Sequence, residues 1–192
     1  MLAQIILFVL DTVCGFLSLA LLVRFAMQWA RTPFRNPLGQ FVVAVTDRMV
    51  RPVRRLIPGL FGLDMASLLL AWLWQVVYQG IALGLSGVLL AVSPAPTLVV
   101  ALLALLEVAK ISLYLVMGAV LVSAVFSWVN PYAPLAEVFN TLTRPLLRPF
   151  RRVIPPIGGV DLSPLALLLL LQIALFVVAS LRNGVLPMIL MS

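Results

Sequence analysis

The chain has 192 residues, of which 64% are hydrophobic and 10% are charged, and its formal net charge is +7. A typical soluble domain has about 45–50% apolar and about 25% charged residues, and a chain of this size has no core large enough to bury so much apolar surface. The composition excludes a soluble globular protein, so lipid must solvate much of the chain.

Four apolar stretches are long enough to cross a bilayer, which needs about 20 residues. In chain order they span roughly residues 2–29, 65–91, 98–128 and 162–182. The first has no basic residues before it and is interrupted by Asp11, so we interpret it as a retained helix and not as a signal peptide. The sequence therefore predicts an all-α membrane protein with four transmembrane helices.

The connections after the first and third stretches carry most of the positive charge. Ten of the thirteen Lys and Arg residues lie in segments 31–55 and 144–152. Basic segments beside apolar spans are typical of cytoplasmic loops, so we expect both arginine-rich loops inside the cell and both termini outside. The same placement argues against a nucleic-acid partner.

Each arginine-rich connection contains an amphipathic segment. Residues 38–51 and 135–148 place apolar side chains on one helical face and polar side chains on the other. This pattern predicts interfacial helices, with the apolar face against the acyl chains and the cations at the phosphates. We expect Pro52 and Pro149 to interrupt these helices, because proline removes a backbone donor.

The two connections are copies of one unit. Residues 37–64 match residues 134–161 at a constant offset of 97, with VRPVRRLIP in one half and LRPFRRVIP in the other, and Trp29 aligns with Trp128 at an offset of 99. The sequence predicts two repeats, residues 1–92 and 97–192, each consisting of a helix, a basic segment and a helix. Two spans return the chain to its starting side, so the repeats are parallel, with an axis along the membrane normal.

The segments NPLGQFVVAVTDRMVRPVRRLIP and LTRPLLRPFRRVIPPIGGVDLSP resemble the YggT (YlmG) family of small bacterial and plastid membrane proteins. The resemblance covers nearly the whole chain, although Arg144 stands where the family often has an acidic residue. It implies a multi-pass protein of the bacterial inner membrane. The family has been linked to osmotic-stress tolerance and ion uptake, to cell division and nucleoid distribution, and in plastids to cytochrome cofactor assembly. The resemblance implies a membrane-housekeeping role and no defined reaction.

The repeated R-P-x-R-R pattern is the main candidate site. One interpretation is that its arginines only fix the topology; the other is that they bind anionic lipid or a partner protein, because each basic residue near an anionic surface contributes about 1 kcal/mol. The spacing leaves both open. The residues concerned are Arg51, Arg54, Arg55, Arg148, Arg151 and Arg152.

The acidic residues suggest two further groups. Asp64 and Asp161 directly precede spans two and four, so we expect them to cap those helices; a cation or proton site is the alternative. Asp11 and Lys110 occupy equivalent positions when Trp29 and Trp128 are superposed, which predicts an ion pair between the repeats. Glu107, one turn before Lys110, is a competitor for the same ammonium, and an ion path is the alternative function.

No constellation for catalysis is evident. The chain has no His and only one Cys, and it lacks a metal-ligand cluster, a phosphate-binding loop and a nucleophile–base pair. We therefore expect no enzyme activity, cofactor or metal. Three hypotheses remain: an accessory protein that binds membrane phospholipids or a protein partner, an ion channel or transporter formed by a homo-oligomer, and a scaffold for division or complex assembly.

Overall fold

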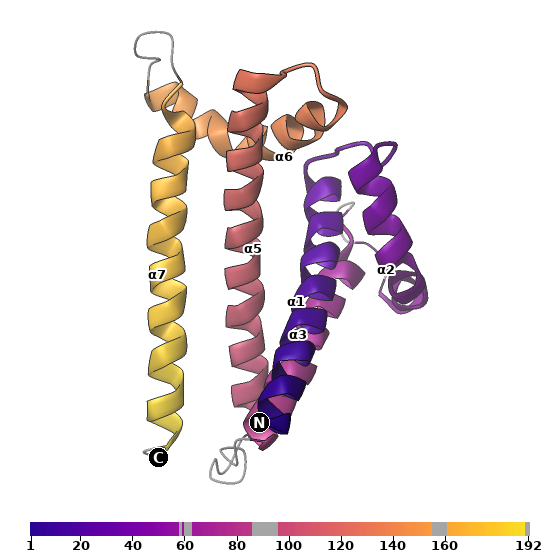
Figure 1. The fold of residues 1–192 in the computed structure, drawn as a ribbon, viewed down its shortest axis with the longest axis vertical. Helices are drawn as coiled ribbons and strands as arrows, with labels where there is room; N and C mark the ends of the chain where they lie inside the picture. Colours follow the sequence, from indigo (N-terminus) through magenta and orange to yellow (C-terminus); the bar gives the residue numbers. More distant parts are fainter. Residues whose placement is uncertain (58, 60–62, 86–95, 155–160, 191–192) are drawn as a thin grey trace.

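The computed structural model describes residues 1–57, 59, 63–85, 96–154 and 161–190, and the regular structure in this part of the chain is six α-helices (Figure 1). In chain order they are α1 (Leu2–Trp29), α2 (Pro37–Leu56), α3 (Met65–Leu85), α5 (Pro96–Val129), α6 (Pro134–Val153) and α7 (Ser163–Leu190).

Four of these helices, α1, α3, α5 and α7, are long and apolar enough to cross a membrane. They run along the long axis of the molecule, whereas α6 lies across one end, α2 runs obliquely from near that end along α1, and both termini are at the other end (Figure 1). In the most apolar stretch of α7 only 11% of the residues are buried by protein. The remaining apolar side chains need lipid around them, which supports a multi-pass membrane protein. The end of the second predicted stretch, residues 86–91, lies outside the described residues.

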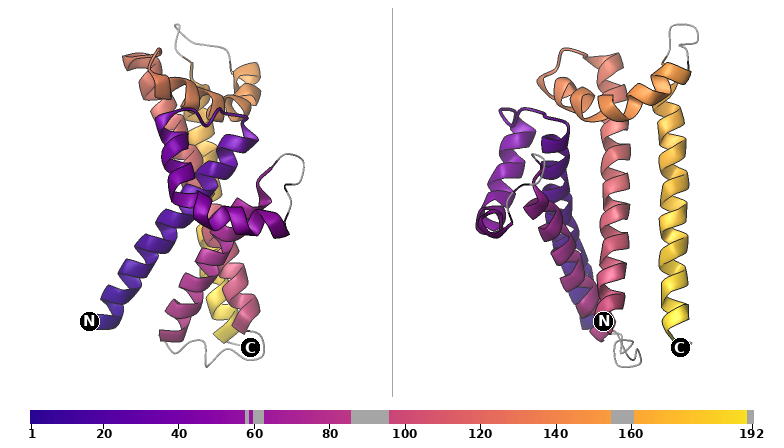
Figure 2. Two further views of the ribbon diagram at one scale, coloured as in Figure 1. Left: turned by 90° about the vertical axis from the view of Figure 1, so that its right-hand side faces the viewer. Right: turned by 180° about the vertical axis from the view of Figure 1, so that it is seen from behind.

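The predicted interruption of the amphipathic helices at Pro52 and Pro149 is wrong. Helix α2 continues to Leu56 and α6 continues to Val153. The helical hydrogen bonds resume after each proline, since the Ile57 amide donates to Val53 O and the Ile154 amide donates to Phe150 O. A proline removes only its own donor, and the following residues can resume the ladder after a bend. Helix α6 is visibly bent (Figure 2).

The turn between α1 and α2 is tightly built. Arg31, just after α1, has a positive φ of 54°, which allows the amide of Thr32 to reach Met27 O and close the helix end. Asn36 then caps α2 by accepting the Gly39 amide at 2.8 Å. A Cβ atom on Gly39 would lie 2.7 Å from the carbonyl oxygen of Phe34, so only glycine fits there without a shift.

Each half has its own apolar core at the place where its two spans meet its amphipathic helix. In the first half Leu21, Val50 and Ala71 are fully buried together. In the second half Val120, Leu147 and Leu171 form the corresponding cluster. A third cluster joins the halves, because Met27 of α1 packs against Val138 and Leu142 of α6.

Candidate functional site at the arginine-rich end

We use "arginine-rich end" for the end of the molecule formed by α2, α6 and the adjoining ends of the spans. Eleven arginines and four carboxylates lie there, whereas Asp11, Glu107, Lys110 and Arg182 in the spans balance one another. The entire formal charge of +7 therefore belongs to this end. Ten of the eleven arginines are exposed: Arg31, Arg35, Arg48, Arg51, Arg54, Arg55, Arg144, Arg148, Arg151 and Arg152.

The eleventh arginine, Arg24 of α1, is buried and organises the first half. Its Nη1 donates to Thr46 Oγ1 at 2.9 Å, its Nη2 donates to Asp47 Oδ1 at 3.2 Å, and its Nε lies 3.3 Å from Asp64 Oδ2. One guanidinium thus links α1 to α2 and to the start of α3. No role for Arg24 was predicted from the sequence, although a cation inside an apolar span is itself a sign of a buried partner.

Asp64 is the acidic centre of this network. Its fully buried carboxylate accepts two bonds from Arg54, at 3.2 and 2.7 Å, and one from the Ser67 hydroxyl at 2.8 Å. Asp64 was predicted to cap α3 with its side chain. The carboxylate instead accepts hydrogen bonds from Arg54 and the Ser67 hydroxyl, and it is the backbone carbonyl of Asp64 that accepts the Ser67 amide at the start of α3. Burial alone would raise the pKa of Asp64, but hydrogen bonds from Arg54 and Ser67 outweigh it and lower that pKa.

Asp47 completes the first half. Burial acts to raise its pKa, but hydrogen bonds from Arg24 and Arg51 outweigh it and lower the pKa of this carboxyl. The Arg51 guanidinium contributes a 2.6 Å ion pair one turn along α2 and is itself 77% exposed. Arg51 thus neutralises Asp47 from the solvent side, while Arg24 does so from inside.

The second half keeps the Arg–Asp pair in a more open form. Arg151 donates to Asp161 through Nε alone, at 2.8 Å, and the two side chains are 52% and 41% exposed. The other carboxylate oxygen of Asp161 accepts the amide of Ser163, the first residue of α7, at 2.9 Å. Although burial acts to raise the pKa of Asp161, its bonds to Ser163 and Arg151 outweigh this effect and lower it.

A cavity of about 510 Å³ opens beside this pair, between α5, α6 and α7. Its polar lining includes Ser123, Asn140, Arg151 and Asp161, and its apolar lining includes Val120, Trp128, Leu165 and Leu168. Ser123 donates to Asn140 Oδ1 at 2.6 Å, and its oxygen lies 3.4 Å from the Thr143 hydroxyl, which donates to Phe139 O at 2.8 Å. The cavity thus combines one carboxylate, one guanidinium and the polar side chains of Ser123, Ser127 and Asn140 with an apolar wall.

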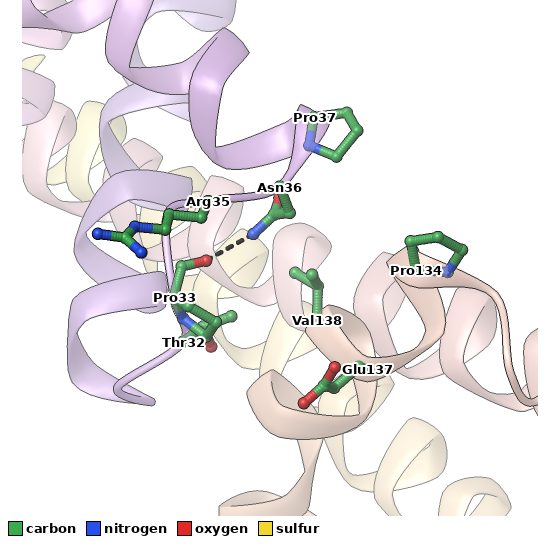
Figure 3. Close-up of a pocket in the computed structure, with 8 residues that line it drawn as sticks. All are labelled: Thr32, Pro33, Arg35, Asn36, Pro37, Pro134, Glu137 and Val138. Carbon is green, nitrogen blue, oxygen red and sulfur yellow. Dashed lines mark hydrogen bonds between the residues drawn. The ribbon is translucent and has the colours of Figure 1, made fainter.

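A smaller pocket of about 220 Å³ lies where the halves meet, between the α1–α2 turn and the start of α6 (Figure 3). Asn36 donates to Pro33 O at 2.6 Å there, and the guanidinium of Arg35 points away from Glu137 (Figure 3). The hydroxyl of Thr32, which is only 4% exposed, has no hydrogen-bond partner in the described part of the chain.

The charges near the opposite end form a different arrangement from the predicted one. Glu107 pairs with Lys110 at 2.5 Å and with Arg182 of α7 at 3.1 Å, while Asp11 lies near Tyr78 of α3. Within the described residues Asp11 and Lys110 form no ion pair, so the predicted inter-repeat pair is not made. The Lys110 ammonium pairs with the competitor Glu107 instead, because side chains at i and i+3 already lie next to each other on one helix.

The six predicted arginines divide into two groups. Arg51, Arg54 and Arg151 each pair with an aspartate. In the part of the chain that the structure describes, the other three form no ion pair and are exposed: Arg55, Arg148 and Arg152. No group of three potential metal ligands occurs among the described residues.

Comparisons with known proteins agree on one family. The CCB3/YggT family matches residues 3–85 and 102–182, one range in each half, and the two ranges begin 99 and end 97 residues apart. An uncharacterized protein of Pseudomonas aeruginosa is 38% identical over 86% of this chain and 84% of its own length. The uncharacterized protein YggT of Escherichia coli strain K12 is 38% identical over 86% of this chain and 85% of its own length. A Vibrio alginolyticus protein is 35% identical over 88% of this chain and 90% of its own length. No solved structure matches the chain.

Proposed function

The chain belongs to the CCB3/YggT family, and we propose that it is an accessory protein of the bacterial inner membrane that binds anionic phospholipid through its arginine-rich end. The observation that carries this proposal is the separation of charge. The whole formal charge of +7 lies at this end, and eight of its exposed arginines belong to the two amphipathic helices that flank the spans. Helices of this kind lie at headgroup depth, where clustered basic residues attract anionic lipid.

In this proposal the two halves are parallel repeats, their arginine-rich loops lie in the cytoplasm, and both termini are outside. The similar offsets of the two matched ranges, 99 residues at their start and 97 at their end, support the repeat. A cysteine at Gln40, in a variant without Cys14, is expected to be protected from an impermeant external reagent, and one at Thr97 is expected to be labelled. The reverse pattern contradicts the orientation.

Binding to anionic lipid would anchor a small protein at the inner leaflet, where it could support osmotic, ion and envelope homeostasis. The alternative of an oligomeric channel has less support, because the Glu107 carboxylate pairs with both Lys110 and Arg182 and joins two helices of one half. Charged groups that pair with one another to hold two helices together are not free to line a pore. A scaffold role would use the same arginine surface for a protein partner.

The three arginines without an ion pair allow a clean test of lipid binding. We expect the triple change Arg55→Gln, Arg148→Gln and Arg152→Gln to leave the Arg–Asp pairs intact and to lower the retention of phosphatidylglycerol and cardiolipin in native mass spectrometry. The matched control replaces the same three residues with Lys, which keeps the charge and should retain most binding. Raised salt should imitate the Gln variant, because these side chains are exposed. Equal retention in all three proteins contradicts the proposal.

A further inference from the structure

The two halves of the molecule differ at one internal position in a way that opens a binding site. Thr46, Arg54 and Asp64 of the first half recur as Thr143, Arg151 and Asp161 of the second, each 97 residues later. These three side chains surround the Arg24 guanidinium in the first half: Thr46 and Asp64 contact it directly, and Arg54 shares the Asp64 carboxylate.

The residue equivalent to Arg24 in the second half is a serine. The superposition of Trp29 on Trp128 sets an offset of 99 in the spans, which places Ser123 opposite Arg24. The contacts agree, because Arg24 donates to Thr46 in the first half and the Ser123 oxygen lies 3.4 Å from the hydroxyl of the equivalent Thr143. The second half therefore keeps two of the three groups that contact Arg24, as Thr143 and Asp161, and has a serine in place of the cation.

The cavity of about 510 Å³ lies at this position, with Ser123, Asn140, Arg151 and Asp161 in its lining. Its volume is within the range of small-ligand sites. Asp161 uses one oxygen for Arg151 and the other for the Ser163 amide, and its counterpart Asp64 shows that an aspartate here can serve two cationic partners at once.

A simple cation does not fit the surroundings. Asp47, the second carboxylate on Arg24, is replaced in the second half by Arg144, so the local charge is more positive than in the first half. The Arg151 guanidinium meets Asp161 only through Nε, and its two terminal nitrogens have no partner in the described part of the chain. The occupant should therefore carry an anionic group beside its cationic group.

The apolar wall of the cavity adds a third requirement. Leu165, which is 66% exposed, and Trp128, which is 81% exposed, continue from the cavity onto the outer surface of the spans. An occupant with hydrocarbon attached to a zwitterionic headgroup would match all three features. We propose that this cavity binds the headgroup of an aminophospholipid such as phosphatidylethanolamine. The ammonium lies at Asp161, Ser123 and Asn140, and the phosphate lies at Arg151.

This inference goes beyond the proposed binding of anionic lipid and shares only Arg151 with it. In native mass spectrometry from mixed-lipid nanodiscs, the full chain should retain phosphatidylethanolamine in preference to phosphatidylcholine, because a quaternary ammonium has no N–H to donate. Asp161→Asn should weaken that retention about tenfold, the factor for one charge-assisted hydrogen bond. Asp11→Asn, which removes an aspartate near the opposite end, is the matched control and should change nothing.

A second variant tests the same site by filling it. Ser123→Arg should place in the second half the guanidinium that the first half already contains, and so exclude the ammonium while leaving phosphatidylglycerol retention unchanged. If folded Asp161→Asn and Ser123→Arg proteins both keep the preference for phosphatidylethanolamine, the inference is wrong. If soluble phosphoethanolamine competes as well as the lipid does, the occupant is a water-soluble zwitterion and the lipid assignment is wrong. If the unchanged protein retains phosphatidylethanolamine but shows no preference for phosphatidylglycerol, the proposed function is contradicted and the inference about this site is not.

Discussion

Asp64 and Asp161 occupy equivalent positions in the sequence but should differ widely in their contribution to stability. Asp64 is fully buried and contacts Arg24, Arg54 and Ser67. Asp161 is 41% exposed and pairs only with Arg151, which is 52% exposed. The substitution of each aspartate by Asn keeps the shape of the side chain and removes its charge, so the two variants form a matched pair.

The expected magnitudes follow from burial. Removal of one partner from a buried ion pair costs about 3–5 kcal/mol. Because Arg24 keeps Asp47 at 3.2 Å, we expect Asp64→Asn to lower the free energy of unfolding by about 2–4 kcal/mol, somewhat less than that full cost. An exposed pair contributes only about 0–1 kcal/mol. The amide oxygen of the substituted side chain can still accept the Ser163 amide, so Asp161→Asn should cost at most about 1 kcal/mol.

The measurement is equilibrium unfolding of both variants and the unchanged protein in one detergent, followed by the fluorescence of the four tryptophans. Equal losses for the two variants, or a larger loss for Asp161→Asn, would refute the reasoning from burial. A small loss for both would mean that water reaches Arg24 and hydrates it when Asp64 is neutral. In that case Arg24→Met should also be mild, although it leaves two carboxylates without their inner partner.

Three further predictions concern acid, one glycine and one ion pair. The three aspartates that pair with arginine have lowered pKa values. Their contribution to stability is therefore present above the unfolded pKa of about 3.9 and is lost as the pH falls through the folded pKa. The free energy of unfolding of Asp64→Asn should accordingly fall less steeply with decreasing pH than that of the unchanged protein. Gly39→Ala should destabilise by about 1–3 kcal/mol through the clash with the preceding turn, whereas Gly15→Ala, which has open space within 4 Å, should be neutral or slightly stabilising in a thermal unfolding assay. A double-mutant cycle with Glu107→Gln and Arg182→Gln should give a coupling energy of about 0.5–2 kcal/mol, and additive effects would show that α5 and α7 are not joined there.

The sequence was sufficient for those features that depend on hydropathy and charge along the chain. The spans follow from uninterrupted apolar runs, and the exposure of the ten arginines follows from the cost of burying a charge without a partner. The long amphipathic helices were also predicted, with the same error in both, since α2 runs through Pro52 to Leu56 and α6 runs through Pro149 to Val153. A proline near a helix end loses one hydrogen bond, and tertiary packing of the apolar face can outweigh that loss.

Partners across helices could not be predicted in the same way. The offset between Trp29 and Trp128 fixes the depth of Asp11 and Lys110 along the membrane normal, but it does not say which face of each helix they occupy. The structure places Asp11 against Tyr78. The link from Arg24 to Asp64 spans 40 residues and depends on how α2 crosses α1 and α3, which no local pattern encodes.

The difference between the halves follows from where each arginine is anchored. In the first half the cation belongs to α1, so the network closes on itself and contributes stability wherever the protein is folded. In the second half the shorter side chain of Ser123 leaves Thr143 and Asp161 without an internal cation of this kind, so they contribute fully to stability only when a ligand is bound in the cavity. Binding to the folded state alone stabilises it in proportion to the logarithm of ligand concentration. The second half should therefore gain more stability than the first when lipid is added, and Ser123→Arg should remove that difference.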